Sequence, residues 1–157
     1  MNGKQRKEVT FVLTRGVKEY RATIPYFVNE DDVVLEVGAA WGTTTEILYH
    51  HAKKVVGIDP GKALETAIET YPRIQFEPID GFDISAILDL GYEFTKVYID
   101  ISGCRKILDV VSMATKYAAA LRPDVIVIKS TQLKGFVSNC IVWSDEGRKG
   151  KQTSNAY

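Results

Sequence analysis

The sequence predicts an α/β fold, a doubly wound, mostly parallel sheet of about seven strands with helices on both faces. Short apolar segments rich in β-branched residues alternate with longer amphipathic segments. Such alternation is typical of a parallel sheet that is covered on both sides. A further observation is the stretch VVLEVGAAWGTTTEIL, residues 33–48, where an apolar run ends on a glycine-rich turn and continues with a helical pattern.

Five strands are expected in the core of the sheet, with a helix after each of the first four. The predicted strands are DVVLEVG (32–38), KVVGIDP (54–60), RIQFEPID (73–80), KVYIDIS (96–102) and DVIVIKS (124–130). The predicted helices are TTTEILYHHA (43–52), GKALETAIETYP (61–72), DISAILDLG (83–91) and a long amphipathic helix over 104–123. Thr43 is a typical helix cap, Pro72 ends the second helix and Gly91 closes the third.

Segments at both ends of the chain are expected to extend this core. EVTFVLTRG (8–16) predicts an extra strand, and VKEYRATIPYFV (17–28) predicts a helix before the first core strand. NCIVWSD (139–145) and TSNAY (153–157) are expected to end the chain as strands. We therefore expect one domain over 1–157, with an N-terminal strand and helix extension over 1–30 and the core over 31–157.

The composition excludes several classes of protein. The chain has 157 residues, 45% of them hydrophobic, and 20 basic residues balance 20 acidic ones, so net charge indicates no nucleic-acid partner. Basic clusters near both ends are typical of solvated tails, with an RNA-facing patch as the alternative. Two cysteines without CxxC spacing favour reduced thiols and a cytoplasmic location. No apolar run approaches the ~20 residues of a membrane span, no metal site is expected, and the oligomeric state stays open.

The candidate site follows from the position of the strand ends, because ligands of such sheets bind beyond the carboxyl ends of the strands. The first core strand ends in the turn Gly38, Ala39, Ala40, Trp41 and Gly42. Small residues there allow a ligand to approach the backbone, and the next helix offers free N–H groups. The spacing is not GxGxxG, since Ala40 takes the place of the second glycine. This disfavours a dinucleotide site and an NAD-linked oxidoreductase.

Acidic residues end the next two strands. Asp59, followed by Pro60, lies about 20 residues after the glycine turn, where an acid can bind ribose hydroxyls; the alternative is a helix cap. The third strand ends in Asp80, Gly81 and Phe82. This acid could accept from an adenine amino group and the aromatic ring could pack on the base; the alternative is a turn without a ligand.

Together these motifs resemble the class I S-adenosylmethionine-dependent methyltransferases. LEVGAAWG is similar to the family's first motif, VVGIDP to the second, EPIDGFD to the third, KVYIDIS to the fourth and DVIVIKS to the fifth, over about residues 32–144. The resemblance implies a Rossmann-like sheet and S-adenosylmethionine as the cofactor. It further implies that the turn over 38–42 lies against the methionine part and that Glu36 organises this turn and contacts the amino-acid end. Asp59 would bind the ribose, and Asp80 with Gly81 or Phe82 would hold adenine.

A finer resemblance concerns the methyl acceptor. The turn GAAWG is similar to the GAAPG turn of FtsJ-type RNA 2′-O-ribose methyltransferases, although Trp41 replaces the proline. Those enzymes use a Lys-Asp-Lys-Glu set, which implies catalytic roles for Lys18, Asp100 and Lys129, Asp100 also bordering the cofactor. Asn155 stands where the final Glu is expected.

The resemblance therefore implies RNA as the candidate substrate, with a ribose hydroxyl as the leading acceptor. SGC (102–104) takes the place of the Asn/Asp-Pro-Pro-Tyr motif of amine-methylating relatives, which argues against an amine acceptor. The alternative is a non-catalytic relative that binds the cofactor or RNA, and an NAD-linked oxidoreductase is the less favoured one.

Overall fold

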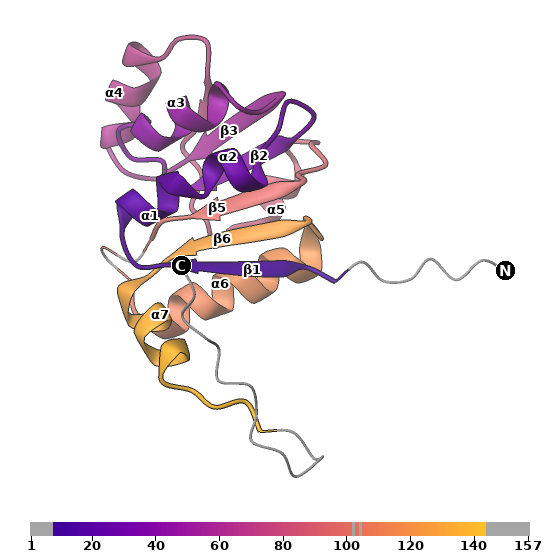
Figure 1. Cartoon of the computed structure of the whole chain (residues 1–157). Helices are drawn as coiled ribbons and strands as arrows, with labels where there is room; N and C mark the ends of the chain where they lie inside the picture. Colours follow the sequence, from indigo (N-terminus) through magenta and orange to yellow (C-terminus); the bar gives the residue numbers. More distant parts are fainter. Residues whose placement is uncertain (1–7, 102, 104, 144–157) are drawn as a thin grey trace, which may run out of the picture.

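The computed structural model describes residues 8–101, 103 and 105–143. Its centre is a six-stranded sheet in the order β1-β6-β5-β2-β3-β4, with every pairing parallel (Figure 1). The strands are β1 (Thr10–Thr14), β2 (Val33–Val37), β3 (Lys54–Ile58), β4 (Gln75–Glu77), β5 (Lys96–Ile99) and β6 (Val125–Lys129). The parallel α/β sheet predicted from the sequence is confirmed, with six strands in the described part of the chain.

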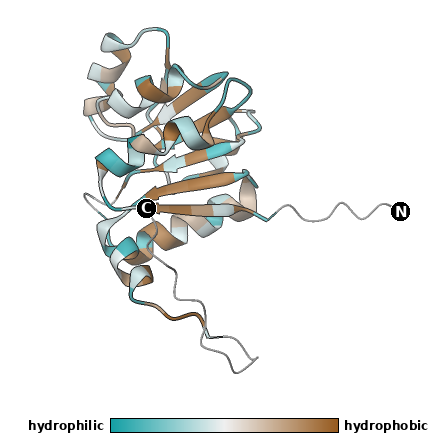
Figure 2. Ribbon diagram, in the orientation of Figure 1, coloured by the Kyte–Doolittle hydropathy of each residue, from teal (hydrophilic) through white to brown (hydrophobic). Residues whose placement is uncertain are grey.

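Helices cover both faces of the sheet (Figure 1). They are α1 (Val17–Ala22), α2 (Ile24–Phe27), α3 (Thr43–Tyr49), α4 (Ala63–Thr70), α5 (Ile84–Leu88), α6 (Ile107–Ala120) and α7 (Thr131–Ser138). On one face, side chains of α1, α2 and α3 pack on Val34 and Tyr98. On the other, side chains of α5, α6 and α7 pack on Leu35 and Val97. Successive strand residues therefore enter opposite cores, and most strand residues are apolar (Figure 2).

The N-terminal extension is part of the sheet. β1 pairs with β6 along its whole length, from Thr10 beside Val125 to Thr14 beside Lys129. The predicted helix over 17–28 forms as two short helices, α1 and α2, with Thr23 between them and a proline in the first turn of α2. The extra strand and the helix expected before the core are thus confirmed.

The prediction of a strand over 139–145 is wrong for residues 139–143. Asn139 follows the last turn of α7, a helix that the sequence analysis did not predict, and residues 140–143 have no regular structure. The physical reason is that β6 already has two neighbours, β5 and β1, so no edge beside it is open to another strand. The strand expected over 153–157 lies outside the described residues.

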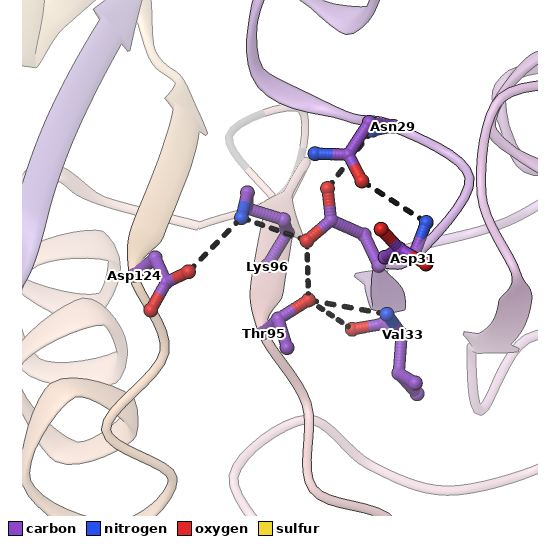
Figure 3. A network of polar contacts seen from close by, with 7 residues as sticks. Asn29, Asp31, Val33, Thr95, Lys96 and Asp124 are labelled. Atoms are coloured by element: carbon purple, nitrogen blue, oxygen red, sulfur yellow. Dashed lines mark hydrogen bonds and ion pairs between the residues drawn. The ribbon is translucent and has the colours of Figure 1, made fainter.

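A buried ion pair joins three strands at the amino end of the sheet (Figure 3). Lys96 Nζ donates to Asp32 Oδ1 at 2.8 Å and to Asp124 Oδ2 at 3.2 Å. Asp32 also accepts from the Thr95 hydroxyl and from the backbone N–H of Asn29. Burial disfavours the charged carboxylate, yet the hydrogen bonds from Lys96 and Thr95 hold the pKa of Asp32 below its usual value. This network fixes the starts of β2, β5 and β6 and lies far from the carboxyl ends that carry the candidate site.

Candidate functional site

The turn after β2 needs glycine at two positions. Gly38 has φ +83°, and a Cβ atom on it would lie 2.1 Å from the carbonyl oxygen of Asp100. Gly42 has φ +76°, and its Cβ would lie 2.9 Å from the ring of Phe76. Between them Ala40 also has a positive φ, +45°, which is uncommon for a residue with a side chain. Trp41 is 62% exposed at the surface of the turn.

Asp59, which directly follows β3, hydrogen-bonds to the backbone of this turn. Its Oδ2 accepts from the backbone N–H of Ala40 at 3.0 Å, and its Oδ1 accepts from Gly61 at 2.7 Å. The first of these bonds supports the uncommon backbone conformation of Ala40. The N-cap of α4 is Lys62, so Asp59 does not cap that helix as the alternative supposed. Each carboxylate oxygen keeps lone pairs for a further donor. Asp59 is half-buried and the neighbouring Pro60 is exposed.

The segment after β4 packs against the end of β2. The Tyr117 hydroxyl donates to the carbonyl oxygen of Gly81 at 2.7 Å, and a Cβ on Gly81 would lie 2.5 Å from the Val37 side chain. Asp80 is exposed and accepts from the backbone N–H of Phe82 at 3.0 Å. The guanidinium of Arg105 lies 5.1 Å from the centre of the Phe82 ring. The close packing at Gly81 brings Asp80 and Phe82 to the same edge of the sheet as the glycine turn.

Glu36 is the buried acid of β2. Its side chain accepts a hydrogen bond from the Thr45 hydroxyl in the first turn of α3, and the residue is 2% exposed. Burial raises the pKa of Glu36 to about 8. The Thr45 hydrogen bond and Arg21 act against this shift, and the carboxylates of Asp100 and Asp59 add to it. Without a cationic ligand the neutral carboxyl is therefore favoured up to about pH 8.

This burial predicts a pH-dependent stability that Glu36→Gln should remove. In the unfolded chain Glu36 loses its proton near pH 4.5, whereas the folded protein holds it to about 8. The associated stability is complete below pH 4.5 and is lost as the pH rises through 8, with a slope of up to about 1.4 kcal/mol per pH unit. Urea unfolding at pH 5.5 and 8.5 should show a smaller loss for Glu36→Gln than for wild type. Glu69→Gln, at an exposed position of α4, is the control, and identical losses in all three proteins would contradict the assignment.

Asp100 and Lys129, two of the predicted catalytic residues, form an ion pair. Asp100 follows β5 and Lys129 ends the neighbouring β6, and Lys129 Nζ lies 2.7 Å from Asp100 Oδ1. Each side chain is 21% exposed, so the pair is open to a substrate. A surface cavity of about 320 Å³ begins at Ser130, the next residue, and is also lined by Arg105, Thr131 and Gln132. The structure thus brings together two of the three predicted catalytic residues, and a cavity begins at the residue that follows Lys129.

Lys18, the third predicted catalytic residue, is exposed on α1. It precedes the buried Tyr20 by two residues, so the two side chains leave the helix on different sides. The catalytic role of Lys18 stays a prediction, and Asn155 lies outside the described residues.

Two residues of α1 that the sequence analysis did not propose contact the elements that carry the site. The Nε of Arg21 donates to the Thr44 hydroxyl at 3.0 Å, which joins α1 to the first turn of α3. Tyr20 is fully buried, and its ring packs edge-on against Tyr98 with the centroids 5.2 Å apart. A tyrosine on an apolar helix face gives no sequence signal of a site, because only the three-dimensional contacts distinguish it from an ordinary core residue.

Neither a metal centre nor a membrane span is present among the described residues. Over 8–101, 103 and 105–143, no group of three or more His, Cys, Asp or Glu side chains is arranged to hold a metal ion. None of the helices in this part of the chain has the length and apolar character needed to span a bilayer.

Comparison with known proteins shows likeness to methyltransferases. No protein-family model matches the chain. Ribosomal RNA small subunit methyltransferase A of Ureaplasma parvum serovar 3 is 26% identical over 125 residues, which cover 79% of this chain and 42% of that protein. The chain therefore spans about two fifths of the length of this relative.

Solved structures show the same fold. A dimethyladenosine transferase from Plasmodium falciparum matches with a TM-score of 0.59 at 16% identity, over 82% of this chain and 47% of that one. A candidate methyltransferase from Streptococcus mutans, in complex with SAH, matches with a TM-score of 0.54 at 16% identity, over 69% and 67% of the two chains. The chain thus has the Rossmann-like fold of the class I methyltransferases, as the motifs implied.

Proposed function

We propose that the chain binds S-adenosylmethionine at the carboxyl ends of β2, β3 and β4 and transfers its methyl group to RNA. The observation that carries the proposal is the hydrogen bond between Asp59 and the backbone of Ala40. This bond joins the residue expected to hold the ribose to the turn expected to hold the methionine part. The methyltransferase names of the relative and of the two solved structures support the same class of reaction.

The residues present suit such a cofactor. The glycines at 38 and 42 let the turn pack closely on Asp100 and Phe76, which would hold its backbone at the edge where the ligand would lie. Asp59 would orient the ribose hydroxyls, and Asp80 with Gly81 or Phe82 would hold the adenine. Glu36, beneath the turn, would contact the amino-acid end. The bound cofactor would supply a methyl group on a positively charged sulfur, and the protein would supply the position and the charge of the acceptor site.

A ribose hydroxyl is the acceptor that the Asp100–Lys129 pair supports. The pair lies at two neighbouring strand ends, and its side chains are 2.7 Å apart and partly exposed. A lysine that has lost its proton could take the proton of a hydroxyl, with Asp100 holding it in position. Lys18 is proposed as the third member of this set.

An adenine amine is the second candidate, favoured by the names of the relatives. One solved neighbour is a dimethyladenosine transferase, and the curated relative acts on ribosomal RNA by its name. The two candidates leave different products. RNA methylated with labelled cofactor should be digested to nucleosides and analysed by mass spectrometry. A 2′-O-methyl nucleoside would support the ribose hydroxyl, N6-methylated adenosine would support the amine, and unlabelled RNA would contradict both.

The cofactor assignment predicts a large effect of Asp59→Ala. We expect calorimetry to show that the wild type binds S-adenosylhomocysteine and that Asp59→Ala binds it more weakly by about 1.5–3 kcal/mol, because two hydroxyls lose a charged acceptor. Asp59→Asn should lose less affinity, since its amide oxygen can still accept a hydrogen bond from one backbone N–H group. Asp83→Ala is the control, because Asp83 caps α5 through Ala86 and has no proposed ligand. Equal affinities of wild type and Asp59→Ala would refute the ribose assignment.

A further inference from the structure

Tyr20 carries an unusual hydroxyl group. It is completely buried, and it is the one buried side-chain polar atom of the described residues that has no hydrogen-bond partner. Leaving a buried hydroxyl unpaired costs about 1–3 kcal/mol. Tyr98 and Tyr117, the other two fully buried tyrosines, bond through their hydroxyls to Thr23 and to Gly81. The fold therefore satisfies comparable groups elsewhere and leaves Tyr20 unsatisfied.

Tyr20 packs in an apolar cluster, and the charges of two acids act on its hydroxyl. Burial, followed by the charges of Glu36 and Asp100, raises the pKa of Tyr20 well above its usual value, so the hydroxyl keeps its proton. Both of these acids belong to the strand ends of the candidate site, Glu36 in β2 and Asp100 after β5. The neighbouring Arg21 ties the same turn of α1 to α3 through Thr44. Tyr20 packs on Tyr98, and Tyr98 pairs in register with Glu36, so Tyr20 lies beside the strands that carry the acid beneath the glycine turn.

We propose that Tyr20 is a ligand-binding residue whose hydroxyl accepts a hydrogen bond from the α-ammonium group at the amino-acid end of the cofactor. This inference rests on the proposed function. An ammonium group fits because it is a donor with positive charge, and it would meet an acceptor at Tyr20 and two acids at Glu36 and Asp100. By this assignment α1 forms one wall of the cofactor site and selects ligands with an intact amino-acid end.

The experiment compares two ligands and two variants. S-adenosylhomocysteine has the amino-acid end, whereas 5′-methylthioadenosine has the same adenosine and thioether without it. Tyr20→Phe keeps the ring that packs on Tyr98 and removes only the hydroxyl. Calorimetry should show binding of S-adenosylhomocysteine weakened roughly 5- to 30-fold in Tyr20→Phe, the loss of one buried hydrogen bond. Binding of 5′-methylthioadenosine should be unchanged.

Tyr98→Phe is the matched control, because it removes a buried hydroxyl whose partner is Thr23. It should lower the melting temperature and leave the ratio of the two affinities as in wild type. Tyr20→Phe without ligand should melt at the wild-type temperature or higher, since it removes an unpaired polar group. The inference alone is overturned if wild type binds S-adenosylhomocysteine and Tyr20→Phe binds it equally well, or loses both ligands to the same extent. If wild type binds neither ligand, the proposed function fails and the inference with it.

Discussion

Gly38→Ala is expected to destabilise the protein severely. The left-handed backbone at Gly38 costs a residue with a side chain roughly 1–2 kcal/mol. The new Cβ would in addition lie 2.1 Å from the backbone oxygen of Asp100, and no side-chain rotation can relieve a contact with backbone. Either β2 or the end of β5 must shift, which disturbs the centre of the sheet. Because domains are stable by only about 5–15 kcal/mol, we expect a large drop in the urea midpoint.

Gly91→Ala separates the two causes of this loss. Gly91 has a similar positive φ, +75°, but nothing lies within 4 Å of a Cβ built there. It should show the conformational cost alone, and Gly38→Ala should be clearly less stable than Gly91→Ala. If the two variants unfold at the same urea concentration, the close approach to Asp100 is not what requires glycine at position 38. A folded Gly38→Ala protein with wild-type stability and ligand affinity would contradict both roles of this glycine.

Lys129→Ala is expected to abolish methyl transfer while leaving cofactor binding within a few-fold. Loss of a general base typically lowers a rate by ~10²–10⁴-fold. The variant would also leave Asp100 without the ammonium group that lies 2.7 Å away. Affinity for S-adenosylhomocysteine should persist, because the lysine belongs to the end of β6 and the proposed adenosine contacts belong to β3 and β4. Single-turnover transfer from labelled cofactor to RNA measures the rate, and calorimetry measures the affinity.

Lys134→Ala is the control for the loss of one positive charge. Lys134 of α7 forms an ion pair of the same length, 2.7 Å, with Glu19 of α1, and it has no role in the proposed catalytic set. Its loss should leave transfer close to the wild-type rate. An active Lys129→Ala variant would place the base elsewhere and return Lys129 to the role of a surface lysine at a strand end. Active wild type, inactive Lys129→Ala and active Lys134→Ala together would support the ribose-hydroxyl mechanism.

The core of the fold was predictable because its elements carry local signals. All five predicted core strands form, since each is a short apolar run bounded by a turn or a helix pattern. The error at 139–143 has a tertiary cause. Ile141, Val142 and Trp143 have side chains typical of strands, but a strand needs a partner, and β1 from the other end of the chain occupies the place beside β6. No local sequence pattern indicates which strand will occupy the position beside β6.

The candidate site was predictable to the extent that it follows strand ends. The parallel sheet brings the turn over 38–42, Asp59 and Asp80 to one edge, and the register of β5 and β6 brings Asp100 to Lys129. The hydrogen bond from Ala40 to Asp59 and the unpaired hydroxyl of Tyr20 could not be predicted. Both depend on backbone geometry and on packing between segments distant in sequence, which residue types and spacing do not encode.

The pairing of β1 with β6 also has a consequence for how the chain reaches its native state. β1 joins residue 10 to residue 125 in register, so β1 cannot enter the sheet until β6 has been synthesised. Contacts between residues so far apart slow folding, because the loop between them must be closed before the contact gains any energy. During synthesis β1, with its exposed Phe11, stays an unpaired strand, which is the kind of segment that chaperones protect. Refolding experiments should therefore find β1 among the last elements protected from hydrogen exchange.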